Sequence, residues 1–216
     1  MLLAFDTATP AVTIALYDCD PEGPRVLAET TTVDGRRHGE LLAPGITPVL
    51  DRAGIVRQDL TAIGVGVGPG PFTGLRVGLV TARTLGMVLG IPVYGVCTLD
   101  VLAAEAVAAG AVASDFLVAT DARRKEVYWA AYDELGNRLD GPFVSKPADA
   151  ATDGPVVGRG ALLYPDSLPN FVAPENPRAG MLAEVIAGER AVLLDPEPLY
   201  LRRPDAVAPG KPKRVS

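Results

Sequence analysis

Two stretches of this chain repeat one another at an offset of 115 residues, and this repeat constrains the fold more than any other feature. The copies span residues 2–18 and 117–133, and each holds a short apolar segment ending in aspartate, a turn, and a β-rich segment. Identical residues occupy seven paired positions, which in the first copy are Leu2, Ala4, Asp6, Val12, Ala15, Tyr17 and Asp18. Because self-similarity at a fixed offset marks a duplicated structural unit, we expect two related strand–turn–strand units.

Hydrophobic periodicity predicts further strands and helices after each of the two copies. In the first half we expect strands at 2–5, 12–17, 25–32, 62–67 and 92–96, and helices at 40–53, 75–90 and 99–109. In the second half we expect strands at 117–121, 127–133, 138–144 and 156–157, and a helix at 179–188. Two tandem β-β-β-α-β-α units, each with an acidic residue closing its first strand, predict an α/β fold of the actin-like, sugar-kinase-like (ASKHA) class. We predict subdomains at 1–110 and 111–200, and a flexible tail at 201–216.

A turn rich in glycine and proline, GPGPFTGLRVG at 68–78, joins the fourth expected strand to a helix. It lacks the Gly-Lys-Ser/Thr of a P-loop, and its third glycine comes one residue too late for a dinucleotide fingerprint. Unpaired N–H groups at a helix start still attract anions. The residues that could lie near an anion or nucleotide are Asp6, Gly70, Thr73, Gly74 and Arg123. The alternative is a closely packed turn in which Thr73 caps the helix.

Each of the charged candidate residues also has a simpler structural explanation. Asp6 and Asp121 could hold a metal-bound water, but each could equally cap the turn after its strand, and we favour the cap. Arg123, Arg124 and Lys125 could bind phosphate or RNA, although such a run is more often the solvated tip of a hairpin, which we also favour.

The net charge and the cysteines exclude several classes of protein. A net charge of −6 argues against a stand-alone nucleic-acid binder, which needs a basic surface. No apolar run reaches membrane length, and the start lacks the basic residues of a signal peptide. Cys19 and Cys97 fit no metal or redox spacing. We therefore expect a cytoplasmic protein that does not bind membranes.

A stripe of small residues follows the glycine run along the next helix. Gly78, Ala82 and Gly86 recur every four residues, a pattern that lets another helix approach closely. The predicted partner surface comprises Leu41, Leu42, Leu75, Arg76, Gly78, Leu79, Ala82 and Gly86. The alternative is that the stripe packs against the chain's own sheet.

Five motifs in order along the chain are similar to those of the TsaB (YeaZ) family. They are DTAT at 6–9, HGELLAP at 38–44, the glycine run, DAR with EVY at 121–128, and PLYLR at 198–202. The resemblance implies a dimerisation and scaffold subunit of the bacterial complex that makes N6-threonylcarbamoyladenosine (t6A) at position 37 of tRNAs reading codons that begin with A. It implies a heterodimer with the catalytic paralogue TsaD through the helical face described above, work alongside the ATPase TsaE, and tRNA bound through the complex. An exposed apolar helical face seeks cover, so pairing of the isolated chain with itself is left open. We expect no cofactor held tightly by this chain, and ATP at the level of the complex is left open.

A departure from the catalytic paralogue sharpens this expectation. The paralogue carries a metal-binding His-x-x-x-His after the strand that corresponds to 91–96, and the two positions fall here on Thr98 and Leu102. Neither side chain ligates a metal as imidazole does, and His38 is the only histidine in the sequence. We therefore expect no metal site and no catalysis, and we expect His38 to cap the start of the helix that follows it. A peptidase is disfavoured because four serines and one histidine form no spaced triad. The alternative is a stand-alone minimal actin-like ATPase or kinase.

Overall fold

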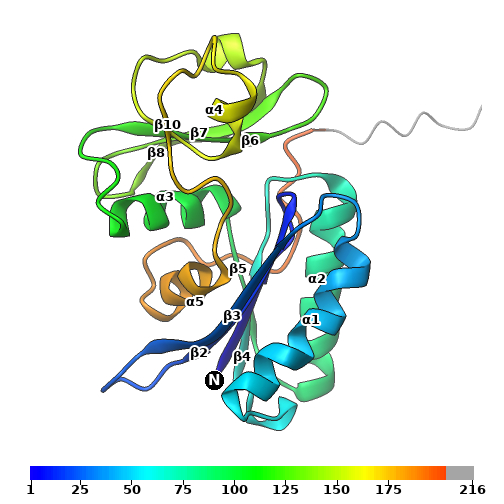
Figure 1. The fold of residues 1–216 in the computed structure, drawn as a ribbon. Helices are drawn as coiled ribbons and strands as arrows, with labels where there is room; N and C mark the ends of the chain where they lie inside the picture. The colour runs from blue at the N-terminus through cyan, green and yellow to red at the C-terminus, as the bar shows by residue number, and fades with distance from the viewer. Residues whose placement is uncertain (203–216) are drawn as a thin grey trace, which may run out of the picture.

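Two five-stranded sheets form the frame of the computed structural model, which describes residues 1–202 (Figure 1). The first sheet has the strand order β3-β2-β1-β4-β5, and the second has the equivalent order β8-β7-β6-β9-β10. In both sheets the first strand of the copy pairs antiparallel with the second and parallel with the fourth. The duplication is therefore real, and the predicted α/β actin-like architecture of two subdomains is confirmed. The predicted tail lies, from residue 203 onward, outside the described residues.

The predicted elements are present with small shifts at their ends, and the structure adds β10, α4 and two short 3-10 turns that were not predicted. The strands are β1 Leu2–Asp6, β2 Ala11–Asp18, β3 Arg25–Val33, β4 Ala62–Gly66, β5 Val93–Val96, β6 Phe116–Asp121, β7 Val127–Tyr132, β8 Arg138–Ser145, β9 Val156–Val157 and β10 Phe171–Val172. The helices are α1 His38–Ala53, α2 Phe72–Leu89, α3 Thr98–Ala108, α4 Arg159–Leu163 and α5 Ala179–Ala187, with short 3-10 turns at Arg57–Asp59 and Pro147–Ala150. The second 3-10 turn stands where the first copy has α1, so the second subdomain is smaller.

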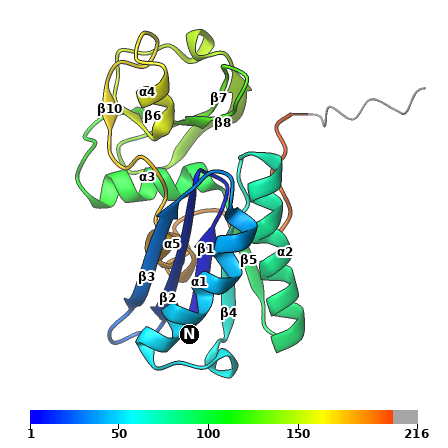
Figure 2. The same cartoon turned by 45° about the vertical axis from the view of Figure 1, so that its right-hand side comes forward.

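Alternation along β1 divides the first subdomain into layers. Leu3 and Phe5 face a core built with α1 and α2, whereas Leu2 and Ala4 face a second core built with α5. Successive side chains of a strand point to opposite faces of the sheet, so helices cover both faces of this one (Figures 1 and 2).

The two subdomains exchange a helix across the line between them. α3 packs its Leu99, Leu102 and Ala106 against Phe116 and Tyr132 of the second sheet. α5 comes from the predicted C-terminal range but packs its Leu182 and neighbouring residues on the first sheet. The two helices also contact each other, so they form the joint between the sheets (Figure 1).

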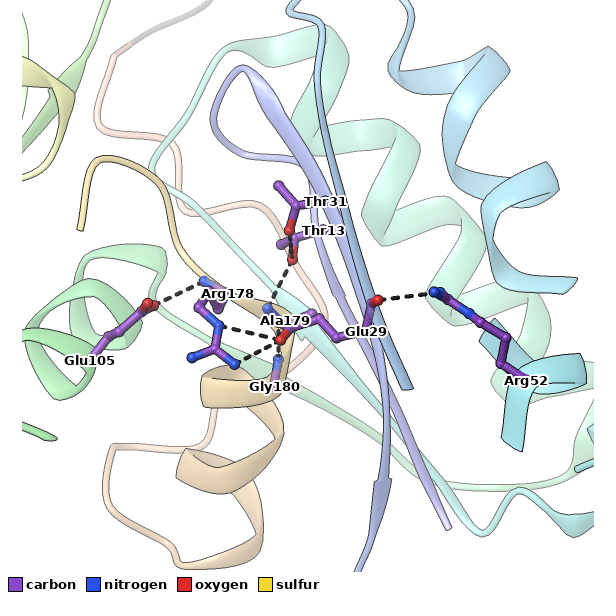
Figure 3. A network of polar contacts seen from close by, with 8 residues as sticks. All are labelled: Thr13, Glu29, Thr31, Arg52, Glu105, Arg178, Ala179 and Gly180. Carbon is purple, nitrogen blue, oxygen red and sulfur yellow. Dashed lines mark hydrogen bonds and ion pairs between the residues drawn. The ribbon is translucent and has the colours of Figure 1, made fainter. Parts of the chain in front are cut away.

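Side chains of the first sheet hold the start of α5 in place (Figure 3). Ala179 N–H donates to Thr13 Oγ1 at 2.9 Å, and Gly180 N–H donates to Glu29 Oε1 at 2.9 Å. Arg178 donates from Nη2 to Glu29 Oε2 at 2.8 Å. The backbone N–H of Arg178 also donates to Glu105 of α3 at 3.1 Å. This network joins β2, β3, α3 and α5, and it supplies acceptors for helix N–H groups that would otherwise lack them.

The glycine-run pocket and the outer face of α2

The glycine run lies directly beneath the turn between β1 and β2. A Cβ atom on Gly70 would meet the carbonyl oxygen of Ala8, and one on Gly74 would lie 2.6 Å from the carbonyl oxygen of Thr7. Thr7 Oγ1 donates a hydrogen bond to Gly74 O at 2.8 Å. The glycines are needed because the backbones of the run and the turn touch. The run is therefore the closely packed turn, but Thr73 does not cap it: the helix begins at Phe72, and the cap position belongs to Pro71, which offers no side-chain hydrogen bond.

Asp6 and Asp121 occupy equivalent places in the two copies. Asp6 Oδ1 accepts from Ala8 N–H at 2.6 Å, and Asp121 Oδ1 accepts from Arg123 N–H at 2.7 Å. Each carboxylate thus caps the turn that follows its strand, which is the favoured alternative. Asp6 is almost fully buried and also accepts from the Thr98 hydroxyl at 2.7 Å. Burial raises the pKa of Asp6, and the bonds from Ala8 and Thr98 oppose that rise.

A pocket of about 360 Å³ opens beside the run, between the first turn, the loop before α1, and the tip of the β6–β7 hairpin. It is lined by Thr9, Pro10, Gly35, Arg36, His38, Gly39, Pro71, Phe72, Thr73, Gly74 and Arg123. The structure therefore brings together three of the predicted anion-site residues, Thr73, Gly74 and Arg123. The other two, Asp6 and Gly70, do not line the pocket and are buried.

His38 lines this pocket, but its contacts suit a structural role. The ring is buried, and Nε2 donates to the carbonyl oxygen of Thr9 at 2.8 Å. A nitrogen that donates to a carbonyl cannot accept a proton as a general base. His38 is also the first helical residue of α1, and Arg37 holds the cap position. Instead of capping, the ring ties α1 to the first turn.

The small-residue stripe of α2 faces the chain's own sheet, so the predicted partner surface is wrong at most of its positions. A Cβ atom on Gly78 would lie 2.5 Å from Thr7 Oγ1, and one on Gly86 would meet Val93 of β5. Full burial in the isolated chain leaves these residues no surface to offer. The positions corrected in this way are Leu42, Leu75, Gly78, Leu79, Ala82 and Gly86. Leu41 is half-buried, and Arg76 is exposed.

The opposite side of α2 carries an apolar surface that the sequence pattern did not assign. Val80 is 63% exposed, Met87 79% and Val88 71%. We call these three residues the outer face of α2. The signal was present in the sequence, because apolar residues cover more than one side of this helix. Among the described residues, α2 is also the one helix long and apolar enough to cross a membrane by length and composition. A single such helix is weak support for a span, and this one packs on the sheet through its inner face.

Arg76 marks the start of this outer face and is held by aromatic rings. Its guanidinium carbon lies 3.4 Å from the centroid of the Phe72 ring, within reach of a cation–π interaction. Its Nε donates to the Tyr200 hydroxyl at 2.8 Å. Tyr200 belongs to a strap at 198–202 that reaches both subdomains. Leu199 N–H donates to Val67 O, and Arg202 pairs with Glu126 beside the β6–β7 hairpin.

Taken together, the paired sheets, the exchanged helices and the packed glycine run define a small two-subdomain protein of the actin-like class. A family model for TsaD, tRNA N6-adenosine threonylcarbamoyltransferase, matches residues 25–164. A crystal structure from Pseudomonas aeruginosa, described as similar to peptidase YeaZ, superposes with a TM-score of 0.76 at 32% identity, covering 93% of this chain and 99% of that one. The chain belongs to the TsaB (YeaZ) family, as its motifs indicated.

Two further relatives bracket the degree of similarity. An uncharacterized protein of Mycobacterium tuberculosis is 44% identical over 213 residues, which is 95% of this chain and 93% of that protein. The tRNA threonylcarbamoyladenosine biosynthesis protein TsaB of Escherichia coli is 36% identical over 137 residues, which is 62% of this chain and 57% of that protein. Similarity to the mycobacterial protein therefore extends over nearly the whole chain, and similarity to the named TsaB extends over less than two thirds of it.

Proposed function

We propose that this chain is the non-catalytic dimerisation subunit of a cytoplasmic complex that transfers a threonylcarbamoyl group to N6 of adenosine 37 in tRNAs reading codons that begin with A. Its partner is a TsaD-type catalytic paralogue, and a TsaE-type ATPase acts with the pair. The observation that carries the proposal is the outer face of α2, an exposed apolar surface on a helix whose other side is already packed.

The outer face suits a helical partner of the same class. Its three members lie seven and eight residues apart, so they share one side of the helix. Burying a valine or methionine side chain is worth about 1.5–3 kcal/mol, so covering these three residues favours association against its entropic cost. A paralogue presents an equivalent helix, which allows related faces to pair. When the paralogue is absent, a second copy of this chain covers the same face.

Local chemistry supports a role without catalysis. Thr98 stands where the catalytic paralogue has a metal-binding histidine, and its hydroxyl is committed to Asp6. His38 is committed to a backbone carbonyl. Asp6, the carboxylate that an actin-like enzyme would turn toward a metal ion, is buried beneath the pocket rather than lining it. This chain therefore binds nucleotide weakly by itself, and ATP is used at the level of the complex.

The test compares two substitutions at equally exposed apolar positions. Val88 and Leu135 are both 71% exposed, and Leu135 lies in the β7–β8 turn, away from α2. Val88→Glu should leave the monomer folded and abolish co-purification with the TsaD paralogue and tRNA modification by the pair. Leu135→Glu should leave both intact.

Two results would contradict the proposal. One is full tRNA modification by the TsaD paralogue alone, since a required scaffold would then be unnecessary. The other is an intact heterodimer in the Val88→Glu variant on size-exclusion chromatography. Calorimetry of the isolated chain with ATP and magnesium separates the alternative of an independent ATPase or kinase, for which binding would be micromolar.

A further inference from the structure

The tip of the β6–β7 hairpin has an unusual backbone. Arg123, Arg124 and Lys125 have φ angles of 61°, 55° and 62°, and Ala122 N–H closes the loop by donating to Glu126 O at 3.0 Å. This left-handed region is unfavourable for residues with a Cβ atom, and hairpin turns that require it favour glycine, asparagine or aspartate. The chain places three long cations there instead.

The first copy of the unit serves as an internal comparison. Its equivalent turn contains Ala8, Thr9 and Pro10, none of which has a positive φ angle. That turn carries no charge and is largely buried against the glycine run. The two turns differ in register, because Asp6 pairs with Thr13 whereas Asp121 pairs with Val127, so the second turn is one residue shorter. The first copy therefore shows that a turn at this place needs no cations, and the shorter turn of the second copy closes with left-handed residues. Glycine or asparagine would fit these left-handed positions with less strain, so three long cations at an exposed tip motivate a functional hypothesis.

Further cations lie on both sides of the tip. On one side, Arg124, Lys125 and Lys146 line a hollow of about 540 Å³ together with Tyr164. On the other side, Arg123 and Arg36 line the glycine-run pocket. We call Arg36, Arg123, Arg124, Lys125 and Lys146 the basic ridge; all five are exposed.

Nearby acids neutralise only part of the ridge. Asp121 pairs with Arg123 at 3.3 Å, and Glu126 pairs with Arg202 of the strap. Asp166 also lines the hollow. Within residues 1–202, no carboxylate forms an ion pair with Arg36, Lys125 or Lys146. The ridge is thus a local concentration of positive charge on a chain whose net charge is −6.

We infer that the basic ridge binds the sugar-phosphate backbone of the RNA on which the complex acts, and this inference rests on the proposed function. A small anion is bound by converging, sheltered donors, whereas these cations are exposed and spread along both sides of a tip. Spread cations suit a chain of regularly spaced phosphates. Backbone contacts of this kind position an RNA without reading its sequence. The net acidity of the chain then confines RNA to this one surface.

The decisive variant is Lys125→Gly in the full chain, assembled with the TsaD paralogue. Glycine tolerates the left-handed backbone, so relief of strain should raise the melting temperature by about 2–4 °C. Loss of one phosphate contact should weaken tRNA binding on the order of threefold and lower the slope of log K against log salt by about 1. A merely structural residue would not gain stability and lose RNA binding together. Lys146→Gln tests the ridge outside the strained loop and should weaken binding to a similar extent.

Two controls match these changes. Glu189→Gly relieves another exposed left-handed residue, with φ of 48°, without removing a cation, so it should leave tRNA binding intact. Arg25→Gln removes one positive charge at the opposite end of β3 from the loop holding Arg36, about 27 Å away by the rise of a strand. It should change neither the affinity nor the salt slope.

The outcomes separate this inference from the proposed function. Unchanged tRNA affinity and salt slope in both Lys125→Gly and Lys146→Gln, with heterodimer and modification intact, would overturn the ridge and leave the proposed function standing. Failure of the wild-type chain to pair with the TsaD paralogue would instead remove the proposed function. If a polyglutamate peptide binds the ridge as tightly as tRNA at equal salt, and both variants weaken the peptide alone, the ridge serves an acidic protein and the inference is wrong.

Discussion

Replacing Glu29 with alanine should loosen the joint between the two subdomains. The Glu29 carboxylate accepts hydrogen bonds from Gly180 N–H and from the Arg178 side chain, at the point where α5 begins against the first sheet (Figure 3). Glu29 lies on β3, and α5 follows the whole second subdomain in the chain, so the contact is made only in the folded protein.

Two contacts of Glu29 determine how much stability Glu29→Ala should lose. The Gly180 bond fills the role of a helix cap with a charged acceptor, which is worth about 1–2 kcal/mol. The Arg178 side chain is 53% exposed, although that of Glu29 is only 18% exposed, so solvent screens their ion pair and it adds about 0–1 kcal/mol. Glu29→Ala should therefore lower the free energy of unfolding by about 2 kcal/mol and the melting temperature by about 4–8 °C.

Urea denaturation measures this change, and three variants refine it. Glu29→Gln keeps an acceptor for Gly180 N–H and should lose about half as much. Thr13→Val removes the acceptor of the buried Ala179 N–H and should cost about 1–3 kcal/mol. Glu134→Ala, at an exposed turn position, should stay within about 0.5 kcal/mol of wild type.

Hydrogen exchange locates the effect. Amides of α5 should lose protection in Glu29→Ala before those of β1, because the change removes a contact at the start of that helix. A loss of stability below about 0.5 kcal/mol, or unchanged protection of α5, would refute the view that this network fixes the helix to the first sheet.

Three further predictions concern buried groups. Burial raises the folded pKa of Asp6 above its unfolded value, so its contribution to stability falls as pH rises through those values. Asp6→Asn does not titrate and keeps one acceptor oxygen for Ala8 N–H, so it should remove this fall in urea titrations between pH 3 and 7. Gly66→Ala would drive a Cβ atom into the Asp6 carboxylate and should lower the unfolding free energy by about 3 kcal/mol or more; a melting temperature equal to wild type would contradict the packing. Cys97 is buried and its pKa is raised to about 12, whereas Cys19 is exposed. A thiol reagent at pH 8 should therefore label one cysteine in the folded chain and two in urea. Rapid labelling of both cysteines before unfolding would show that Cys97 is accessible.

The duplicated architecture could be predicted from the sequence alone, whereas the glycine run left two interpretations open. The strand that holds Leu3 and Phe5 can be predicted because it is a short continuous apolar run, which is typical of a strand buried on both faces. Aspartates placed identically after the two first strands predicted equivalent turns, and Asp6 and Asp121 make equivalent bonds. These features depend on neighbours close in the chain, or on a repeat visible in it.

The direction in which each helix face points depends on tertiary packing. α2 is apolar on more than one side, so its period alone could not tell that Gly78 and Gly86 meet the sheet while Val88 meets solvent. The exchange of α3 and α5 between subdomains likewise depends on contacts between residues far apart in sequence. The proposed RNA-binding role of the hairpin tip rests on its φ angles and on the position of Lys146 beside it, and neither can be predicted from the sequence. A sequence pattern shows which residues are apolar, whereas the packing of the folded chain determines which apolar residues stay exposed and can contact a partner.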